Sequence, residues 1–508
     1  MLQTHQTIQL VADEAFDLLQ KRFTKHFYEI FLNDLAEKTI VIIPSLSLDK
    51  EILRSVIGAV YYEERMLCML LLLRMPRTRV IYVTSVPIDS RIIDYYLHLM
   101  PDVTAYHARE RLTLLNCYDA SAGSLTEKIL ARPRLIKRIR EHIVAPEMTH
   151  MACFNVTMHE KALALALNIP IFGCDPKLLD LGTKSGSRIL FKKKGISLPK
   201  GIESLQDETG IVSALAELKK GDPTLKKAVV KMNDGFSGEG NAVYYYNNLD
   251  AADIELEKKI AERLSLCLKI VAQEMSYYQY MEKFNSIGGI VEEFIEGAIK
   301  ESPSVQCRIN PLGDTDIIST HDQFLGGESD QVFLGSSFPA NREYTAEISA
   351  LAKIVTDELQ KEGVLGRFSV DFISVKQPTG WKHYAIEINL RKGGTTHPFI
   401  MLQLLTGGAF DWQQGLYMMP DGQTRSYFAS DNVVNEKYKG LTPQDLIDIA
   451  LCNHIQYDNA RQTGVMFHMI GALSQYGKLG MVCIGKTAEE AKVFYNMTIA
   501  ILDKECSI

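Results

Sequence analysis

Short apolar runs alternate with helix-like stretches in the first third of the chain. Four consecutive apolar residues stand at 40–43 and again at 80–83, and a proline follows each run closely. Such runs are typical of strands buried on both faces of a parallel sheet. Apolar residues spaced three and four apart indicate helices over about 1–35, 50–73 and 89–99. We therefore predict an N-terminal α/β domain over residues 1–165.

The pattern changes in the middle of the chain. Between 228 and 400 alternating strand patterns dominate, and one amphipathic helix near 343–361 interrupts them. Helix starts at Thr442-Pro443 and near Thr487 indicate a last unit, in which helices and strands are mixed. We predict a multidomain protein of α/β and α+β units, divided into 1–165, 166–405 and a small α+β unit over 406–508.

Composition excludes several classes of function. The 508 residues carry 55 Lys and Arg against 62 Asp and Glu, and this net charge of −7 argues against nucleic-acid binding through charge. The longest apolar run, 66–73, is far shorter than the roughly 20 residues that span a bilayer. The N-terminus lacks a signal-peptide pattern, and nine scattered cysteines form no CxxC pair. A cytoplasmic protein without membrane partners is expected.

A glycine-rich loop lies between two predicted strands. Lys231 ends the apolar segment 228–231, and the loop that follows contains Gly235, Ser237 and Gly238. P-loops and dinucleotide-binding loops lead into a helix, whereas this loop leads into a second strand. Its backbone N–H groups and Lys231 can bind phosphate oxygens. An ordinary hairpin with a flexible loop is the alternative.

A second segment combines an apolar strand with acidic residues. Residues 290–297 read Ile-Val-Glu-Glu-Phe-Ile-Glu-Gly. A strand that leaves its sheet exposes unpaired backbone groups, which can pair with a purine edge while Phe294 packs beside the ring. The alternative interpretation is a plain acidic strand end.

The most specific pattern is a predicted hairpin. In its second strand Ile386, Ile388 and Leu390 point one way, while Glu387, Asn389 and Arg391 point the other. If the strand 367–372 pairs with it, Asp371 shares the polar face. Two carboxylates and an amide oxygen suit Mg²⁺, and Arg391 can hold an anion beside it. A solvent-facing sheet is the alternative.

The loop after this hairpin is rich in hydrogen-bond donors. It runs Lys392-Gly393-Gly394-Thr395-Thr396-His397-Pro398. Because it leaves the predicted metal strand, we predict that Thr395, Thr396 and His397 contact a substrate.

Taken in order, these segments resemble the ATP-grasp superfamily. The resemblance implies two α+β lobes holding ATP, a nucleotide lobe at about 180–300 and a metal lobe at about 300–405. It implies that Lys184 and Lys231 bind phosphates, that Glu293 and Ile295 contact adenine beside Phe294, and that Glu301 reaches the ribose. It also implies that Asp371, Glu387 and Asn389 hold Mg²⁺, with Mn²⁺ as the alternative ion.

Within this superfamily, the chain more closely resembles the carboxylate–amine ligases of the pheganomycin peptide ligase group. The similarity rests on 181–188, 236–241, 387–391, 394–398 and 463–468, and it extends over nearly the whole chain. It implies ADP-forming ligation of a small-molecule carboxylate to an amine or peptide through an acyl phosphate. Many such ligases have Arg two residues before the metal Asp, where this chain has Ser369. Arg367 and Arg391 therefore both remain candidates for stabilising the acyl phosphate.

Two other functions remain open from the sequence. One is a nucleotide-binding regulatory or scaffold protein without ligation, and the other is a small-molecule kinase. Kinase-type glycine loops precede their lysine, whereas Lys231 precedes this loop. The sequence identifies neither substrate, and a homodimer is left open.

Overall fold

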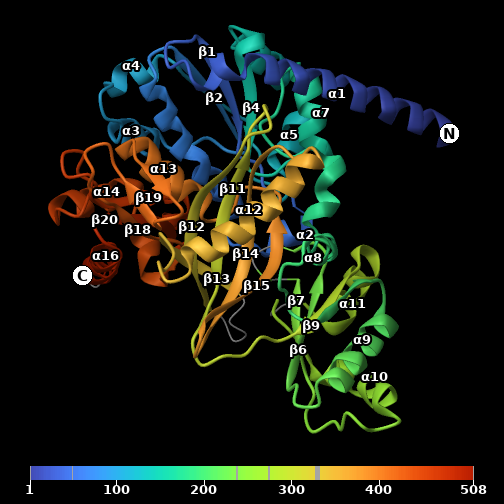
Figure 1. The fold of residues 1–508 in the computed structure, drawn as a ribbon. Helices are drawn as coiled ribbons and strands as arrows, with labels where there is room; N and C mark the ends of the chain where they lie inside the picture. The colour runs from blue at the N-terminus through green and yellow to red at the C-terminus, as the bar shows by residue number, and fades with distance from the viewer. Residues whose placement is uncertain are drawn as a thin grey trace.

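The computed structural model of the chain describes residues 2–48, 50–235, 238, 240–272, 275–326 and 332–506. Figure 1 shows an N-terminal domain, a lobe that projects away from the rest of the molecule, and a large sheet whose strands come from the second half of the chain. In this described part, no helix has the length and apolar composition that a membrane crossing requires.

The N-terminal domain is built on a four-stranded parallel sheet in the order β3-β2-β1-β4. The strands are β1 (Lys38–Ile43), β2 (Thr78–Thr84), β3 (Leu112–Asn116) and β4 (Thr149–Cys153). Every residue of β1 is buried, as its continuous apolar run predicts. The surrounding helices are α1 (Leu2–Phe31), α3 (Ser90–His98), α4 (Ala105–Arg109), α5 (Leu125–Leu130), α6 (Pro133–Glu141) and α7 (Met158–Leu167), with the turn η2 (Pro146–Met148) before β4. The predicted α/β fold is confirmed.

The helix predicted over 50–73 is divided in two. It consists of α2 (Lys50–Ser55) and a 3₁₀ helix, η1 (Ala59–Arg74). Gly58, with a φ of 71°, separates them, because a left-handed residue cannot continue a right-handed helix. Although η1 is buried over much of its length, it contains the charged residues Glu63, Glu64 and Arg65. Glu64 accepts a hydrogen bond from the Gly471 N–H at 3.0 Å, so η1 joins the N-terminal domain to the C-terminal part of the chain.

The projecting lobe contains a five-stranded antiparallel sheet in the order β5-β9-β6-β7-β8 (Figure 1). Its core side chains include Leu215, Val230, Tyr244 and Phe284. The strands are β5 (Gly201–Leu205), β6 (Lys227–Met232), β7 (Asn241–Tyr245), β8 (Leu268–Ile270) and β9 (Gly289–Glu293). The 3₁₀ helix η3 (Pro176–Gly182) and the helix α8 (Lys184–Lys193) lead into this lobe, and α9 (Glu208–Gly221), α10 (Leu256–Cys267) and α11 (Tyr277–Ile287) complete it.

The largest sheet contains nine strands in the described residues. Its order is β10-β14-β11-β12-β13-β18-β20-β19, and β15 pairs with β14. The strands are β10 (Lys300–Glu301), β11 (Pro303–Ile309), β12 (Thr315–Gly326), β13 (Val332–Phe338), β14 (Gly366–Gln377), β15 (Gly380–Asn389), β18 (Ser426–Val434), β19 (Gly464–His468) and β20 (Lys478–Gly485). The helix α12 (Thr345–Lys361) packs against β11 and β12. The sheet continues across the boundary predicted at residue 405, because β18, β19 and β20 extend it.

The remaining elements surround the end of this sheet. They are α13 (Thr396–Thr406), the hairpin β16 (Ala409–Asp411) and β17 (Leu416–Met418), η4 (Glu436–Gly440), α14 (Pro443–Cys452), η5 (Ile470–Ala472), α15 (Leu473–Tyr476) and α16 (Ala488–Glu505). One apolar core connects them with η1 and α3, through side chains such as Leu70, Ile93, Met401 and Val482. The N-terminal domain therefore shares its core with the C-terminal part of the chain.

A close backbone approach fixes the start of β14. Gly366 has a φ of 104°, and a Cβ atom there would lie 2.8 Å from the Gly173 Cα. Gly363 also has a positive φ, of 86°, but a Cβ atom there would meet no other group within 4 Å. The two glycines differ in available space, although both have backbone conformations that disfavour side chains.

We expect Gly366→Ala to lower the thermal unfolding midpoint clearly more than Gly363→Ala. Both substitutions introduce backbone strain, of about 1–2 kcal/mol, but only the first forces a methyl group against the Gly173 backbone. Differential scanning calorimetry of the two variants measures the difference. Equal midpoints would contradict the close approach.

Candidate active site

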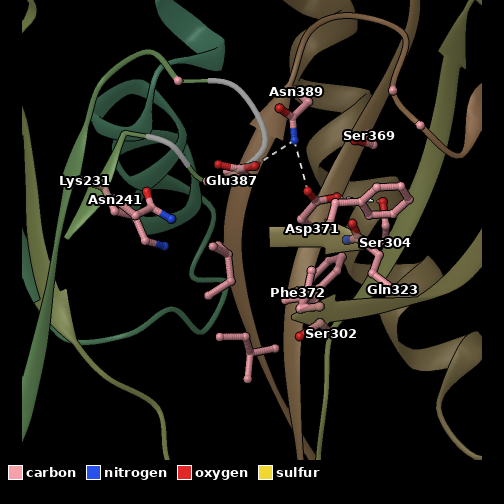
Figure 2. Close-up of a pocket in the computed structure, with 18 of the residues that line it drawn as sticks. Lys231, Asn241, Ser302, Ser304, Gln323, Ser369, Asp371, Phe372, Glu387 and Asn389 are labelled. Carbon is pink, nitrogen blue, oxygen red and sulfur yellow. Dashed lines mark hydrogen bonds between the residues drawn. The ribbon is translucent and has the colours of Figure 1, made fainter. Parts of the chain in front are cut away.

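One cavity of about 460 Å³ lies where the projecting lobe faces the largest sheet. Figure 2 shows Lys231 and Asn241 on one wall, with Asp371 and Asn389 across from them and Glu387 between. Residues of η1 and β18 line it as well, so three parts of the chain contribute. A cavity of this size, with polar groups converging on it, suits a small-molecule ligand.

The β14–β15 hairpin brings the three predicted metal ligands together. Asp371 pairs with Glu387 across the strands, and Ser369 pairs with Asn389. The Asn389 Nδ2 donates to Asp371 Oδ2 at 3.1 Å and to Glu387 Oε1 at 3.0 Å (Figure 2). The Ser304 hydroxyl donates to Asp371 Oδ1 at 2.6 Å. Two carboxylates and an amide thus converge on one side of the cavity.

The alternation predicted for β15 is wrong at Ile386. The register passes from Asp371–Glu387 directly to Phe372–Ala385, which leaves Ile386 as the extra residue of a β-bulge. Ile386 therefore lines the cavity beside Glu387. Ile388 and Leu390 are buried in the core, as predicted.

The two carboxylates share a buried site. Burial and the charge of Glu387 raise the pKa of Asp371, and Ser304 and Lys184 only partly oppose this. Burial alone would raise the pKa of Glu387 as well, but the Lys184 ammonium lowers it below the usual range. A divalent cation relieves such repulsion between carboxylates, and hard oxygen donors suit Mg²⁺. The donor set therefore fits the predicted ion.

Both predicted phosphate lysines line the cavity. Lys184 begins α8 and its ammonium contacts Glu387 Oε2. Lys231, near the end of β6, lies with its Nζ 2.6 Å from Glu292 Oε1. The other oxygen of Glu292 accepts from Arg188 Nη1 at 2.7 Å. The structure thus holds Lys231 and Arg188 on the two oxygens of one buried carboxylate.

The residues predicted to contact the nucleotide also line this cavity. Glu293, Phe294, Ile295 and Glu301 lie together, and the Phe294 ring centroid is 4.9 Å from Lys300 Nζ. The Glu293 N–H donates to Lys200 O at 2.8 Å, so this amide is already bonded within the lobe. Gly235 and Gly238 line the cavity, and Ser237 lies outside the described residues.

The two candidate arginines differ in position. Arg391 lines the cavity beside the predicted metal ligands, and burial lowers the pKa of its guanidinium, although Glu387, Asp234 and Asp371 oppose this effect. Arg367 belongs to β14 but is not part of the cavity wall, and burial lowers its pKa to about 10. Position favours Arg391 for contact with a bound anion.

The predicted substrate loop is divided between the cavity and the core. Thr395 lines the cavity, whereas Thr396 and His397 are buried behind it in the first turn of α13. The Thr396 hydroxyl donates to Gln306 Oε1 at 3.3 Å, and His397 Nε2 lies 3.1 Å from Asp431 Oδ1. Asp431 itself lines the cavity, so His397 lies one residue behind the wall.

Several cavity residues were not found from the sequence. Ser304, Arg65 and Asp431 lie outside the glycine-rich and acidic motifs. The only signal for Arg65 is its place in the charged triplet Glu63-Glu64-Arg65, directly before the apolar run 66–73. A charged triplet inside a buried helix indicates a paired or functional site.

Comparison with known protein families supports the fold assignment. A family model described as IQCH-like, ATP-grasp matches residues 177–278 and 254–413. These ranges include the sheet of the projecting lobe and the β14–β15 hairpin. Residues 177–413 match the ATP-grasp family. A second model, the PGM1 C-terminal domain, matches residues 445–498.

Two curated relatives are similar to the chain over most of its length. The L-propargylglycine–L-glutamate ligase of Streptantibioticus cattleyicolor is 26% identical over 447 residues, covering 87% of this chain and 89% of the relative. The IQ motif-containing protein H of Danio rerio is 22% identical over 526 residues, covering 93% of this chain. The match covers 49% of that protein, so this chain spans about half its length.

The structural likeness concerns the ATP-grasp fold alone. The biotin carboxylase domain of Hydrogenobacter thermophilus 2-oxoglutarate carboxylase superposes with a TM-score of 0.55 at 13% identity. The superposition covers 91% of this chain and 89% of that domain, which was solved with ADP, magnesium and bicarbonate.

We expect Glu387→Gln and Asn389→Ala to lower the rate of ATP-dependent ADP release about 100-fold or more, in line with the loss of one transition-state donor. Both side chains face the cavity and not the core, so both variants should still fold, and the loss of activity should far exceed any loss of folded protein. Glu262→Gln is the control, because it removes the same charge from an exposed position on α10. Early-melting variants whose folded fraction keeps full activity would show that these residues are structural.

Proposed function

We propose that the protein is an ATP-dependent, ADP-forming ligase that joins a carboxylate to an amine through an acyl phosphate. One observation carries the proposal: Lys184 and Lys231 line the same cavity as the oxygen donors of Asp371, Glu387 and Asn389. The similarity to the L-propargylglycine–L-glutamate ligase supports it.

The proposed arrangement assigns ATP to the projecting lobe. Lys184, Lys231 and the backbone around Gly235 and Gly238 bind the phosphates, while the segment at Phe294 holds adenine and Glu301 the ribose. In this assignment the phosphates replace carboxylates as partners of the lysines. Asp371, Glu387 and Asn389 would hold Mg²⁺ or Mn²⁺, which supplies positive charge against the phosphate oxygens when bound.

The proposed chemistry has two steps. A carboxylate oxygen of the first substrate attacks the γ-phosphorus of ATP, the bond from this phosphorus to the bridging oxygen breaks, and ADP leaves. An amine then attacks the acyl carbon, phosphate leaves, and the amine nitrogen gives up a proton. Arg391 lies where it can stabilise the negative charge of the acyl phosphate. The protein acts by positioning and electrostatics and requires no covalent nucleophile.

The substrates are proposed only as classes, a small-molecule carboxylate and an amine or peptide. Nine free cysteine thiols support the cytoplasm as the compartment, because thiols persist in reducing surroundings. A homodimer stays a prediction. Light scattering of the purified protein tests it by measuring the molar mass in solution.

We expect ADP and phosphate, not AMP and pyrophosphate, as the nucleotide products, because attack is at the γ-phosphorus. ADP release should depend on a free carboxylate, and hydroxylamine should trap the intermediate as a hydroxamate. Chromatography of nucleotides and mass spectrometry of products, over a screen of amino acids and short peptides, measure both.

The same screen separates the other two functions. AMP as product would refute the acyl-phosphate mechanism. Binding of ATP without turnover of any substrate would favour a regulatory or scaffold protein. A stable phosphorylated product that no amine consumes would indicate a kinase.

A further inference from the structure

A buried guanidinium lies on the cavity wall without a role in ATP binding or in the metal set. Arg65 of η1 is only 4% exposed. Its Cζ lies 4.5 Å from the ring centroid of Tyr62 and 4.6 Å from that of Phe154, and all three residues line the cavity. Residues three apart share a face of a 3₁₀ helix, so η1 presents Tyr62 and Arg65 together. The two rings fix the plane of the guanidinium.

The hydrogen bonds of Arg65 are incomplete. Its Nη1 donates to Asp431 Oδ2 at 3.2 Å. Its Nε and Nη2 are buried and have no hydrogen-bond partner among the residues that the structure describes. These two nitrogens form one edge of the guanidinium, the edge that binds both oxygens of a carboxylate. Buried donors without a partner are rare, and two of them on one edge of a cavity-lining guanidinium call for a partner that the described residues do not supply.

Asp431 holds this guanidinium through Nη1. Its other oxygen, Oδ1, lies 3.1 Å from His397 Nε2 and 2.8 Å from His468 Nε2. Burial alone would raise the pKa of Asp431, but the imidazoles lower it well below the usual range. Asp431, His397 and His468 have the composition of a metal-ligand set. The Asp431 carboxylate is already paired with the Arg65 guanidinium, whose positive charge repels a metal ion. The cluster therefore serves to hold Arg65 in place.

This wall is close to the reaction site. The loop that leaves the metal strand passes Gly394, which packs against the Phe333 ring. Asn432, next to Asp431, donates to Phe333 O at 3.2 Å. Gly394, Phe333 and Asn432 all line the cavity, so a continuous wall leads from Asn389 to Asp431.

We propose that the free edge of Arg65 binds a carboxylate of the amine substrate, so that the enzyme selects amines such as α-amino acids. This inference rests on the proposed function. The reacting carboxyl group loses its charge when it becomes an acyl phosphate, and it lies with Arg391 at the metal set. A carboxylate that stays charged through the reaction needs a cation of its own, and Arg65 is placed to provide it.

The first test separates the two half-reactions. In Arg65→Met and Arg65→Lys, hydroxamate formation, which needs only the carboxylate substrate and hydroxylamine, should remain within a few-fold of wild type. The kcat/KM for an α-amino acid acceptor should fall about 100-fold, as expected for losing a two-donor bond to a charged group. Arg54→Met is the control, because it removes the same charge from an exposed position on α2. Equal loss of both products in folded variants would overturn the proposal.

The second test changes the ligand and needs no variant. Calorimetric titrations of the wild-type protein, with Mg²⁺ and a non-hydrolysable ATP analogue, compare L-α-amino acids with their α-carboxamides. At least one amino acid should bind about 100-fold more tightly than its amide, and Arg65→Met should remove this preference. If neither hydroxamate nor amide forms in any reaction, the proposed function fails, and the titration still decides the role of Arg65. Equal affinity for acids and amides would overturn that role.

Discussion

Two carboxylates buried on the same face of one hairpin set the main constraint on this structure. Asp371 and Glu387 are cross-strand partners, and burial makes their mutual repulsion expensive. Three groups from separate elements offset it: the Lys184 ammonium of α8, the Ser304 hydroxyl of β11 and the Asn389 amide of β15. The hairpin alone cannot keep this face buried, so α8 and β11 must pack against it.

The position of α8 follows from this requirement. The Ser187 hydroxyl accepts the Ile388 N–H at 3.0 Å, which fixes the helix against β15. At its first turn, Lys184 N–H and Ser185 N–H donate to the backbone and side chain of Asn233, at 3.1 and 3.0 Å. Asn233 lies at the start of the glycine-rich loop. One helix start therefore joins the face of the predicted metal ligands to the loop that we propose for phosphate binding.

The parts of the site that the sequence predicted are those set by local periodicity. Asp371, Glu387 and Asn389 follow from the alternation of two strands, and Lys231 from the strand before a glycine-rich loop. A bulge adds one residue without changing composition, so the alternation could not place Ile386 in the cavity. The sequence around Gly58 does not show whether this glycine breaks the helix or is tolerated within it. Arg65 and Asp431 are 366 residues apart and meet only because the C-terminal strands join the largest sheet.

The charges of the cavity also constrain how ligands enter. Lys184 is paired with Glu387, Lys231 with Glu292 and Arg65 with Asp431, so each of these cations is already matched by a carboxylate. A triphosphate alone would leave Glu387 beside new negative charge once it takes Lys184. A divalent cation alone would compete with Lys184 for the same carboxylate oxygens. In the proposed site, phosphates and cation entering together would divide these partners, the phosphates pairing with Lys184 and the cation with the carboxylates, so that no charge of the Lys184–Glu387 pair would be left unpaired. Arg65 takes no part in this exchange, because its ion pair with Asp431 uses Nη1 and leaves the opposite edge free throughout.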